Sequence, residues 1–146
     1  MNTKSQKGFS LIEVLVFMSI LGLFFVAAAS VTLFSLRNMK VSEHRIIATH
    51  YAEELLSWMK NEKDANWNDF IEKADSGGYT YCFSSLSWPS DTGDCESGDE
   101  ISSIYYRKAL VTLVNSSQVS VKITVDWNDS NITYSVPLNT IFTLWE

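Results

Sequence analysis

The amino-terminal quarter of the chain contains one long apolar run. No charged residue occurs in the range 14–36, and residues 14–34 are apolar apart from the small residues Ser19, Gly22, Ser30 and Thr32. About 20 apolar residues suffice for a helix to cross the hydrocarbon layer of a membrane. Serine and threonine hydroxyls fit inside such a helix because they can bond back to their own backbone. The run therefore predicts a single membrane-spanning helix.

An amphipathic pattern follows without interruption. Residues 37–62 contain neither proline nor glycine, and partly apolar side chains recur three or four positions apart at Val41, His44, Ala48, Tyr51, Ala52, Leu55, Trp58 and Met59. This spacing places them on one stripe of a helix. We expect one continuous helix to about residue 60, roughly 75–80 Å long at 1.5 Å per residue. Its outer half would lay the stripe on a globular head.

The remaining sequence predicts short strands. Tyr79–Phe83 and Ile104–Val114 are rich in residues that favour strands. Strict alternation then places one apolar set on a single face, comprising Val119, Val121, Ile123, Val125 and Trp127, and it resumes at Ile132, Tyr134, Val136 and Leu138. Pro137 lacks an amide donor, so its strand should lie at a sheet edge or be bulged. The expected fold is α+β, a roll with one long helix packed on a three- or four-stranded antiparallel sheet.

Composition limits the possible functions. The 146 residues carry a net charge of −6, divided as +1 over residues 1–36, 0 over 37–62 and −7 over 63–146. Nucleic acid is not an expected partner, because phosphate binding needs a basic face. We find no P-loop, no G-x-S-x-G, no G-x-G-x-x-G and no histidine placed beside a nucleophile. His44 and His50 lie six positions apart, which does not suit a metal pair. We expect neither an enzyme nor a cofactor.

From the residues alone, the amino terminus could be a secretory signal peptide instead of a retained membrane helix. A secretory signal peptide would use Lys4 and Lys7 as its basic region and would end in a cut after Ala29. The apolar run continues past that point, however, and Glu13 lies at its threshold, where an unpaired carboxylate costs about 2.5–3.5 kcal/mol on insertion scales. A disposable leader has no use for such a charge.

The segment Gly8-Phe9-Ser10-Leu11-Ile12-Glu13 follows a short basic leader and precedes the apolar helix. This arrangement resembles the class III signal of type IV prepilins and type II secretion pseudopilins. The resemblance covers residues 7 to about 36. It implies that a prepilin peptidase cuts between Gly8 and Phe9 and methylates the new Phe9 amine. It also implies a removed leader (1–8), a membrane or filament-core helix (9–36), an amphipathic continuation (37–62) and a head (63–146).

The same resemblance implies a structural role in a filament. Glu13 would pair with the Phe9 amine of a neighbouring subunit, since either charge alone is costly in an apolar core; the alternative is that Glu13 reaches the headgroups. The expected partners are the peptidase, other pilin or pseudopilin subunits, and an assembly platform with its ATPase. The protein would start as a single-pass inner-membrane protein with an extracytoplasmic head. A minor pilin is favoured, because many major pilins carry a proline near the position of Ser30 and because the carboxy-terminal hairpin resembles that of minor pilins.

The head contains one pair of cysteines. Cys82 and Cys95 are the only two in the chain, and an even pair in an exported domain favours a disulfide over free thiols or metal ligands. Several acidic side chains crowd Asp91–Glu100. Oxygen ligands in a flexible loop can hold calcium, but the order of residues matches no calcium motif, so we interpret the segment as a solvated acidic loop.

A second class of function is a tethered binding module for glycans or surfaces, and the protein released after Ala29 is a third. The head tryptophans Trp67, Trp88, Trp127 and Trp145 would form the binding platform. Against this, Trp127 and Trp145 are expected in the sheet core, with Trp88 exposed. Glu53 and Glu54 are interpreted as a solvated face. Asn115, Asn128 and Asn131 each begin an N-x-S/T triplet.

Overall fold

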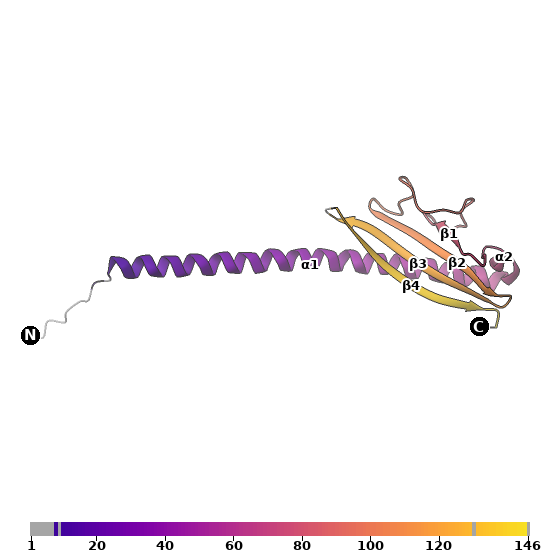
Figure 1. Ribbon diagram of the computed structural model, residues 1–146, viewed down its shortest axis with the longest axis horizontal. Helices are drawn as coiled ribbons and strands as arrows, with labels where there is room; N and C mark the ends of the chain where they lie inside the picture. The colour runs from indigo at the N-terminus through magenta and orange to yellow at the C-terminus, as the bar shows by residue number, and fades with distance from the viewer. Residues whose placement is uncertain (1–7, 9, 130, 146) are drawn as a thin grey trace, which may run out of the picture. The chain divides into compact units, whose positions relative to one another are not determined.

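The computed structural model describes residues 8, 10–129 and 131–145 (Figure 1). Its elements are the helices α1 (Leu11–Ala65) and α2 (Trp67–Ile71) and the strands β1 (Tyr79–Cys82), β2 (Tyr105–Asn115), β3 (Gln118–Asp129) and β4 (Ile132–Thr143). The predicted α+β class, with a long amino-terminal helix and an antiparallel sheet, is confirmed. The chain divides into two compact units, Met1–Glu43 and His44–Glu146. Each unit is described by itself.

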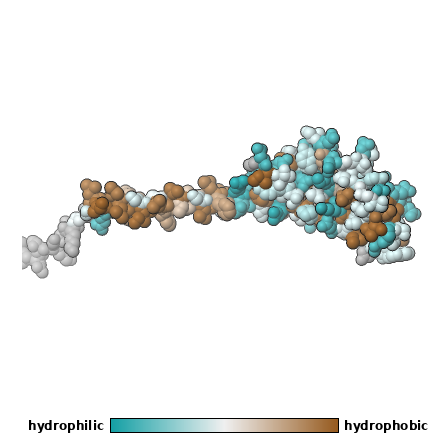
Figure 2. Space-filling view, viewed as in Figure 1, coloured by the Kyte–Doolittle hydropathy of each residue, from teal (hydrophilic) through white to brown (hydrophobic). Residues whose placement is uncertain are grey.

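In the first unit, α1 is apolar and exposed. Among the described residues, α1 is the helix that is long and apolar enough to span a membrane. The hydroxyls of Ser19, Ser30 and Thr32 donate to the carbonyls of Leu15, Val26 and Ala28, at 2.9, 2.9 and 3.0 Å. The polar atoms in the run are therefore satisfied within the helix, as predicted. Figure 2 shows the resulting apolar surface.

The second unit is built around a four-stranded meander. The strand order is β1-β2-β3-β4, and every neighbouring pair is antiparallel. Pro137 lies on the edge strand β4, opposite Thr124, so its missing amide donor is tolerated as predicted. The register aligns Val111 of β2 with Val121 of β3, and Val121 with Thr140 of β4.

One face of this sheet and the stripe of α1 form the core of the second unit. The helix contributes Ala48, Ala52, Leu55 and Met59, and the sheet contributes buried residues that include Ala109, Val111, Val119, Val121, Ile123, Val125, Trp127 and Phe142. All five alternating positions predicted for β3 are buried. The amphipathic stripe and the dry sheet face expected from the sequence thus meet each other.

Two tryptophans depart from the sequence prediction. Trp145 was expected in the core, but its side chain is 86% exposed at the end of the chain, beyond β4. Trp88 was expected to be exposed, but it is half-buried and lies against Phe70 and Tyr81, with ring centroids 5.9 and 5.4 Å apart. Trp145 follows the last strand and has no second element over it, whereas the loop after β1 folds back and brings Trp88 onto the core.

Candidate functional site

The amino-terminal site begins with a glycine that the fold itself does not require. Gly8 is exposed, and a Cβ built on it meets no atom of the described residues within 4 Å. Phe9, the residue expected to be methylated, lies outside the described residues. Among the described residues, nothing therefore requires a glycine at position 8.

Glu13 lies in the first turn of α1. The amides of Glu13 and Val14 donate to the carbonyl of Ser10, at 3.0 and 3.2 Å, and the helix starts at Leu11. A carboxylate in this turn faces the positive end of the helix dipole, which stabilises it by about 0.3–1 kcal/mol. The spacing Ser10-x-x-Glu13 is also that of a capping box, a signal in the sequence that our sequence analysis missed. Glu13 therefore has a stabilising role within one chain before any partner is considered.

The helix surface beyond Glu13 is apolar on all sides. Its large side chains are exposed, with Leu23 at 72%, Val31 at 69% and Phe34 at 68%. A contiguous apolar surface of this length is unfavourable in water and marks a membrane or protein contact. The first unit thus presents a carboxylate at the start of a helix that needs an apolar environment.

In the second unit, a buried arginine joins the sheet to α1. Arg107 of β2 is 1% exposed, and its Nη1 donates to the Glu54 carboxylate at 2.9 Å and to the Tyr51 carbonyl at 3.1 Å. Its Nε donates to the Phe83 carbonyl at 3.4 Å. Glu54 was interpreted as part of a solvated face, and this is wrong, since it is the counter-ion of a buried cation. Sequence reasoning also missed Arg107, although it shares a face with Tyr105 and Ala109 by alternation.

His44 contributes a second link between α1 and the sheet. Its Nδ1 lies 2.5 Å from the Tyr105 hydroxyl, and its ring lies 6.4 Å from that of Trp127. His50, in contrast, is exposed on the helix surface. The two histidines thus point to different surroundings, as their spacing of six predicted.

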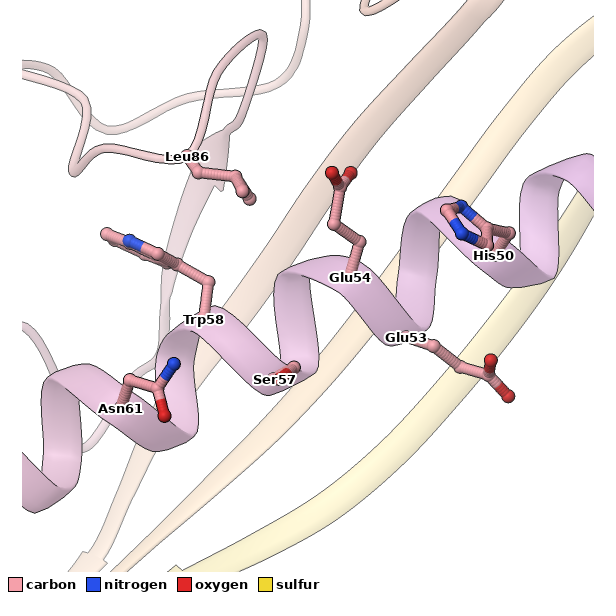
Figure 3. A pocket seen from close by; sticks show the side chains of 7 residues that line it. All are labelled: His50, Glu53, Glu54, Ser57, Trp58, Asn61 and Leu86. Carbon is pink, nitrogen blue, oxygen red and sulfur yellow. The ribbon is translucent and has the colours of Figure 1, made fainter.

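A shallow groove lies along α1 in the second unit. It is lined by His50, Glu53, Glu54, Ser57, Trp58, Asn61 and Leu86 (Figure 3). Figure 3 shows Glu53 directed away from Leu86, while Trp58 lies on the same side as Leu86. Glu54 is already held by Arg107. The groove therefore offers no pair of carboxylates arranged for acid–base chemistry.

The comparison with known families bears on the amino-terminal site. Residues 3–29 match the family described as the prokaryotic N-terminal methylation motif. The chain carries the prepilin-type signature of type IV pilins and pseudopilins. No curated protein and no solved structure matches the chain.

The prepilin-type signature includes Gly8, Phe9 and Glu13 and extends through the first part of the apolar run. It supports a pilin-like or pseudopilin subunit, which is a structural class of protein. Together with the exposed apolar part of α1, the signature fits a membrane-anchored protein with one span.

In the head of this pilin-like chain, a disulfide closes the loop after β1. Cys82 and Cys95 are bonded, with Cα atoms 5.0 Å apart. The Gly93 amide donates to the Thr80 carbonyl at 2.8 Å, which brings the loop back to β1. The 13-residue separation of the cysteines gives a stabilisation of about 3 kcal/mol in the chain-entropy model.

Ionic contacts hold the same loop against the sheet. Lys108 of β2 lies 3.4 Å from the Asp94 carboxylate and 3.3 Å from that of Asp126. Burial alone would lower the pKa of Lys108, but the carboxylates of Asp126 and Asp94 outweigh it and raise this pKa. The Tyr106 hydroxyl donates to Glu100 at 2.6 Å, which lowers the pKa of Glu100.

Among the described residues, no three acidic, cysteine or histidine side chains are grouped as metal ligands would be.

Removing the disulfide should loosen the head. We expect Cys82→Ser with Cys95→Ser to lower the free energy of unfolding by about 3 kcal/mol, because the unfolded chain regains the entropy of an open loop. Chemical denaturation of the detergent-solubilised protein measures this change. The matched control is Ser84→Ala together with Ser97→Ala in the same exposed loop segment, which should leave the midpoint in place. An unchanged midpoint in the cysteine variant would contradict the stabilising role of the bridge.

The tryptophans do not form the platform that a glycan-binding module would need. Trp127 is buried and stacks on Tyr134 at 5.4 Å. The Nε1 of Trp88 donates to Glu62 at 3.1 Å, so its polar atom is used inside the head. Trp145 is highly exposed. Trp67 is half-buried and lies 6.2 Å from the Phe70 ring, so Trp145 alone of these four side chains is highly exposed.

Proposed function

We propose that this protein is a minor subunit of a type IV pilus-like or type II secretion filament. A prepilin peptidase removes residues 1–8 and methylates the Phe9 amine. An assembly platform and its ATPase then pack the subunit into the filament through α1. The observation that carries the proposal is the prepilin-type signature at residues 3–29, which includes the start of the exposed apolar helix α1.

The exposed apolar surface of α1 suits two successive environments. Before assembly, the apolar run of α1 suits the hydrocarbon layer of the inner membrane. After assembly, equivalent helices of other subunits would surround it and keep it away from water. Both environments bury the same side chains, so transfer between them exchanges one apolar contact for another.

We assign to Glu13 the pairing with a neighbouring subunit when the helix moves from the membrane into the filament. Once the leader is removed, Phe9 carries a new cationic amine four positions before Glu13. A neighbouring subunit's amine and the Glu13 carboxylate would neutralise each other, and neither charge would remain unpaired in the apolar core. The favourable interaction of the Glu13 carboxylate with the helix dipole remains in either environment.

A minor position is supported by the regularity of the apolar helix. Many major pilins interrupt this helix with a proline, which removes a backbone donor and bends the helix. Here Ser30 lies near that place, and its hydroxyl donates to the Val26 carbonyl at 2.9 Å. The extracytoplasmic placement of the head is supported by the Cys82–Cys95 bridge, since such bonds persist in oxidising compartments.

Gly8→Val tests the proposed processing. We expect full-length precursor to accumulate in the membrane, because the peptidase needs a residue without a side chain where its catalytic groups approach the backbone. The fold offers no other reason for failure, since a Cβ at Gly8 meets no described atom within 4 Å. Gly22→Val is the matched control, with the same open space around its Cβ. Immunoblotting reports the size of the product, and normal processing of Gly8→Val would count against the cut site.

The first residue of the mature protein separates the proposal from its two rivals. Mass spectrometry of the amino-terminal peptide should find N-methylated Phe9. A chain that starts at Ser30 would indicate a secreted domain released after Ala29. A chain that keeps Met1 would indicate a plain membrane anchor that presents a binding head.

A further inference from the structure

Three asparagines of the head begin N-x-S/T triplets, the acceptor pattern for N-linked glycosylation of exported proteins. They are Asn115, Asn128 and Asn131. The filament role makes no use of these triplets. The structure distinguishes them by what each asparagine side chain already does.

Asn115 uses both atoms of its amide to close the turn between β2 and β3. Its Oδ1 accepts from the amide and the hydroxyl of Ser117, both at 2.9 Å. Its Nδ2 donates to the Gln118 side chain at 3.0 Å. A glycan on Nδ2 would disrupt this bond, so Asn115 is a structural turn residue.

Asn128 is part of the sheet. It lies in β3, where it pairs with Thr133 of β4, and its Oδ1 accepts from the Thr133 hydroxyl at 2.6 Å. Asp126, two positions earlier, forms an ion pair with Lys108 at 3.3 Å. The Asn128 side chain is therefore already engaged within the ladder.

Asn131 differs from both. It lies in the turn between β3 and β4, outside the ladder, with an exposed side chain and a φ of 67°. Its side chain makes no hydrogen bond within the part of the chain that the structure describes. The triplet's hydroxyl comes from Thr133, which is exposed near the start of β4 and donates to Asn128 Oδ1 at 2.6 Å, so the transferase has to open this bond. Figure 1 shows this turn at the end of the sheet opposite the carboxy terminus.

We propose that Asn131 is an acceptor for an N-linked glycan whose donor is an oligosaccharide on a lipid diphosphate. In the transfer, the Asn131 amide nitrogen forms a bond to the anomeric carbon of the sugar. The bond from that carbon to the phosphate oxygen breaks, and the lipid diphosphate leaves with the electron pair. The amide loses one proton to a base of the transferase.

In the cell this modification rests on the proposed function, because the head must reach the compartment in which transfer occurs. The site itself can be tested without export. Purified, detergent-solubilised full-length protein is incubated with a purified bacterial oligosaccharyltransferase and its lipid-linked oligosaccharide. Intact-mass spectrometry then counts the glycans, peptide mapping locates them, and a reference acceptor peptide shows that the enzyme is active.

We expect a gain of one glycan, located on Asn131. The gain should disappear in Asn131→Gln and in Thr133→Val. Asn115→Gln and Asn128→Gln are the matched controls and should retain the gain; Asn128→Gln also shows that loss in Thr133→Val is not due to the lost Asn128–Thr133 bond. An unmodified protein, or a glycan confined to Asn115 or Asn128, would overturn the proposal.

The same variants in cells that contain the transferase separate the two proposals. Modification in the purified system together with an unmodified protein in cells would contradict the extracytoplasmic head and leave the acceptor site intact. Failure in the purified system contradicts the acceptor site and does not affect the filament role.

Discussion

Glu13→Leu should insert into the membrane and be cleaved normally, yet fail to crosslink to other filament subunits. Removing a carboxylate from a spanning helix removes an insertion cost, so the membrane fraction should equal or exceed that of the original protein. In the filament, a neighbour's Phe9 amine would remain as an unpaired buried cation, at a cost of about 3–5 kcal/mol per pair. A cost of that size lowers association by at least about a hundredfold, since each 1.4 kcal/mol is a factor of ten.

Glu13→Gln separates lost charge from altered packing. It nearly preserves the shape of the side chain, so a defect equal to that of Glu13→Leu assigns the effect to the carboxylate. The loss of a favourable helix-dipole contact is only about 0.3–1 kcal/mol and is too small to explain a hundredfold change. Glu43→Gln makes the same change at an exposed position of α1 beyond the apolar run and should crosslink normally. Unchanged crosslinking in both Glu13 variants would indicate a carboxylate that faces the lipid headgroups.

Glu54→Gln should destabilise the head more than any other single change on the outer surface of α1. It leaves Arg107 as a buried cation without its counter-ion, and breaking a buried pair typically costs about 3–5 kcal/mol. The Glu54 side chain is 40% exposed, so solvent screening should place the effect at the lower end of that range. Chemical denaturation measures the change in the free energy of unfolding.

Glu53→Gln is the matched control, since it makes the same change at the neighbouring, exposed position. It should stay within about 0.5 kcal/mol of the original protein, as surface substitutions usually do. Adding Arg107→Met to Glu54→Gln should recover much of the loss, because no unpaired buried charge then remains. Equal stability of the Glu53 and Glu54 variants would contradict the ion-pair interpretation.

The regular elements of the head could be predicted from the sequence because each depends on a short repeat. Alternation with a period of two identified the buried face of β3 from Val119 to Trp127, and all five residues are buried. The missing donor of Pro137 likewise predicted an edge strand, and β4 is one. Both features depend only on local backbone chemistry, which the sequence contains directly.

The contacts between elements could not be predicted in the same way. Glu53 and Glu54 are adjacent and chemically equivalent, and the position of Arg107 in β2 decides which of them becomes a counter-ion. Trp88 could not be assigned either, because its burial depends on how the disulfide-closed loop folds back onto Phe70 and Tyr81. The partner proposed for Glu13 belongs to another subunit, so that pairing depends on assembly and not on the fold of one chain.

The strand order of the head equals the order of the strands along the chain, and this has a consequence for how the head folds. The links between β2 and β3 and between β3 and β4 are two residues long, so closing these hairpins costs little entropy. The link between β1 and β2 spans residues 83–104 and contains Cys95. We therefore expect the β2-β3-β4 meander to form first and within microseconds to milliseconds, as local pairings do. Attachment of β1 then becomes the slow step, and its rate follows the supply of an oxidant for the Cys82–Cys95 bond.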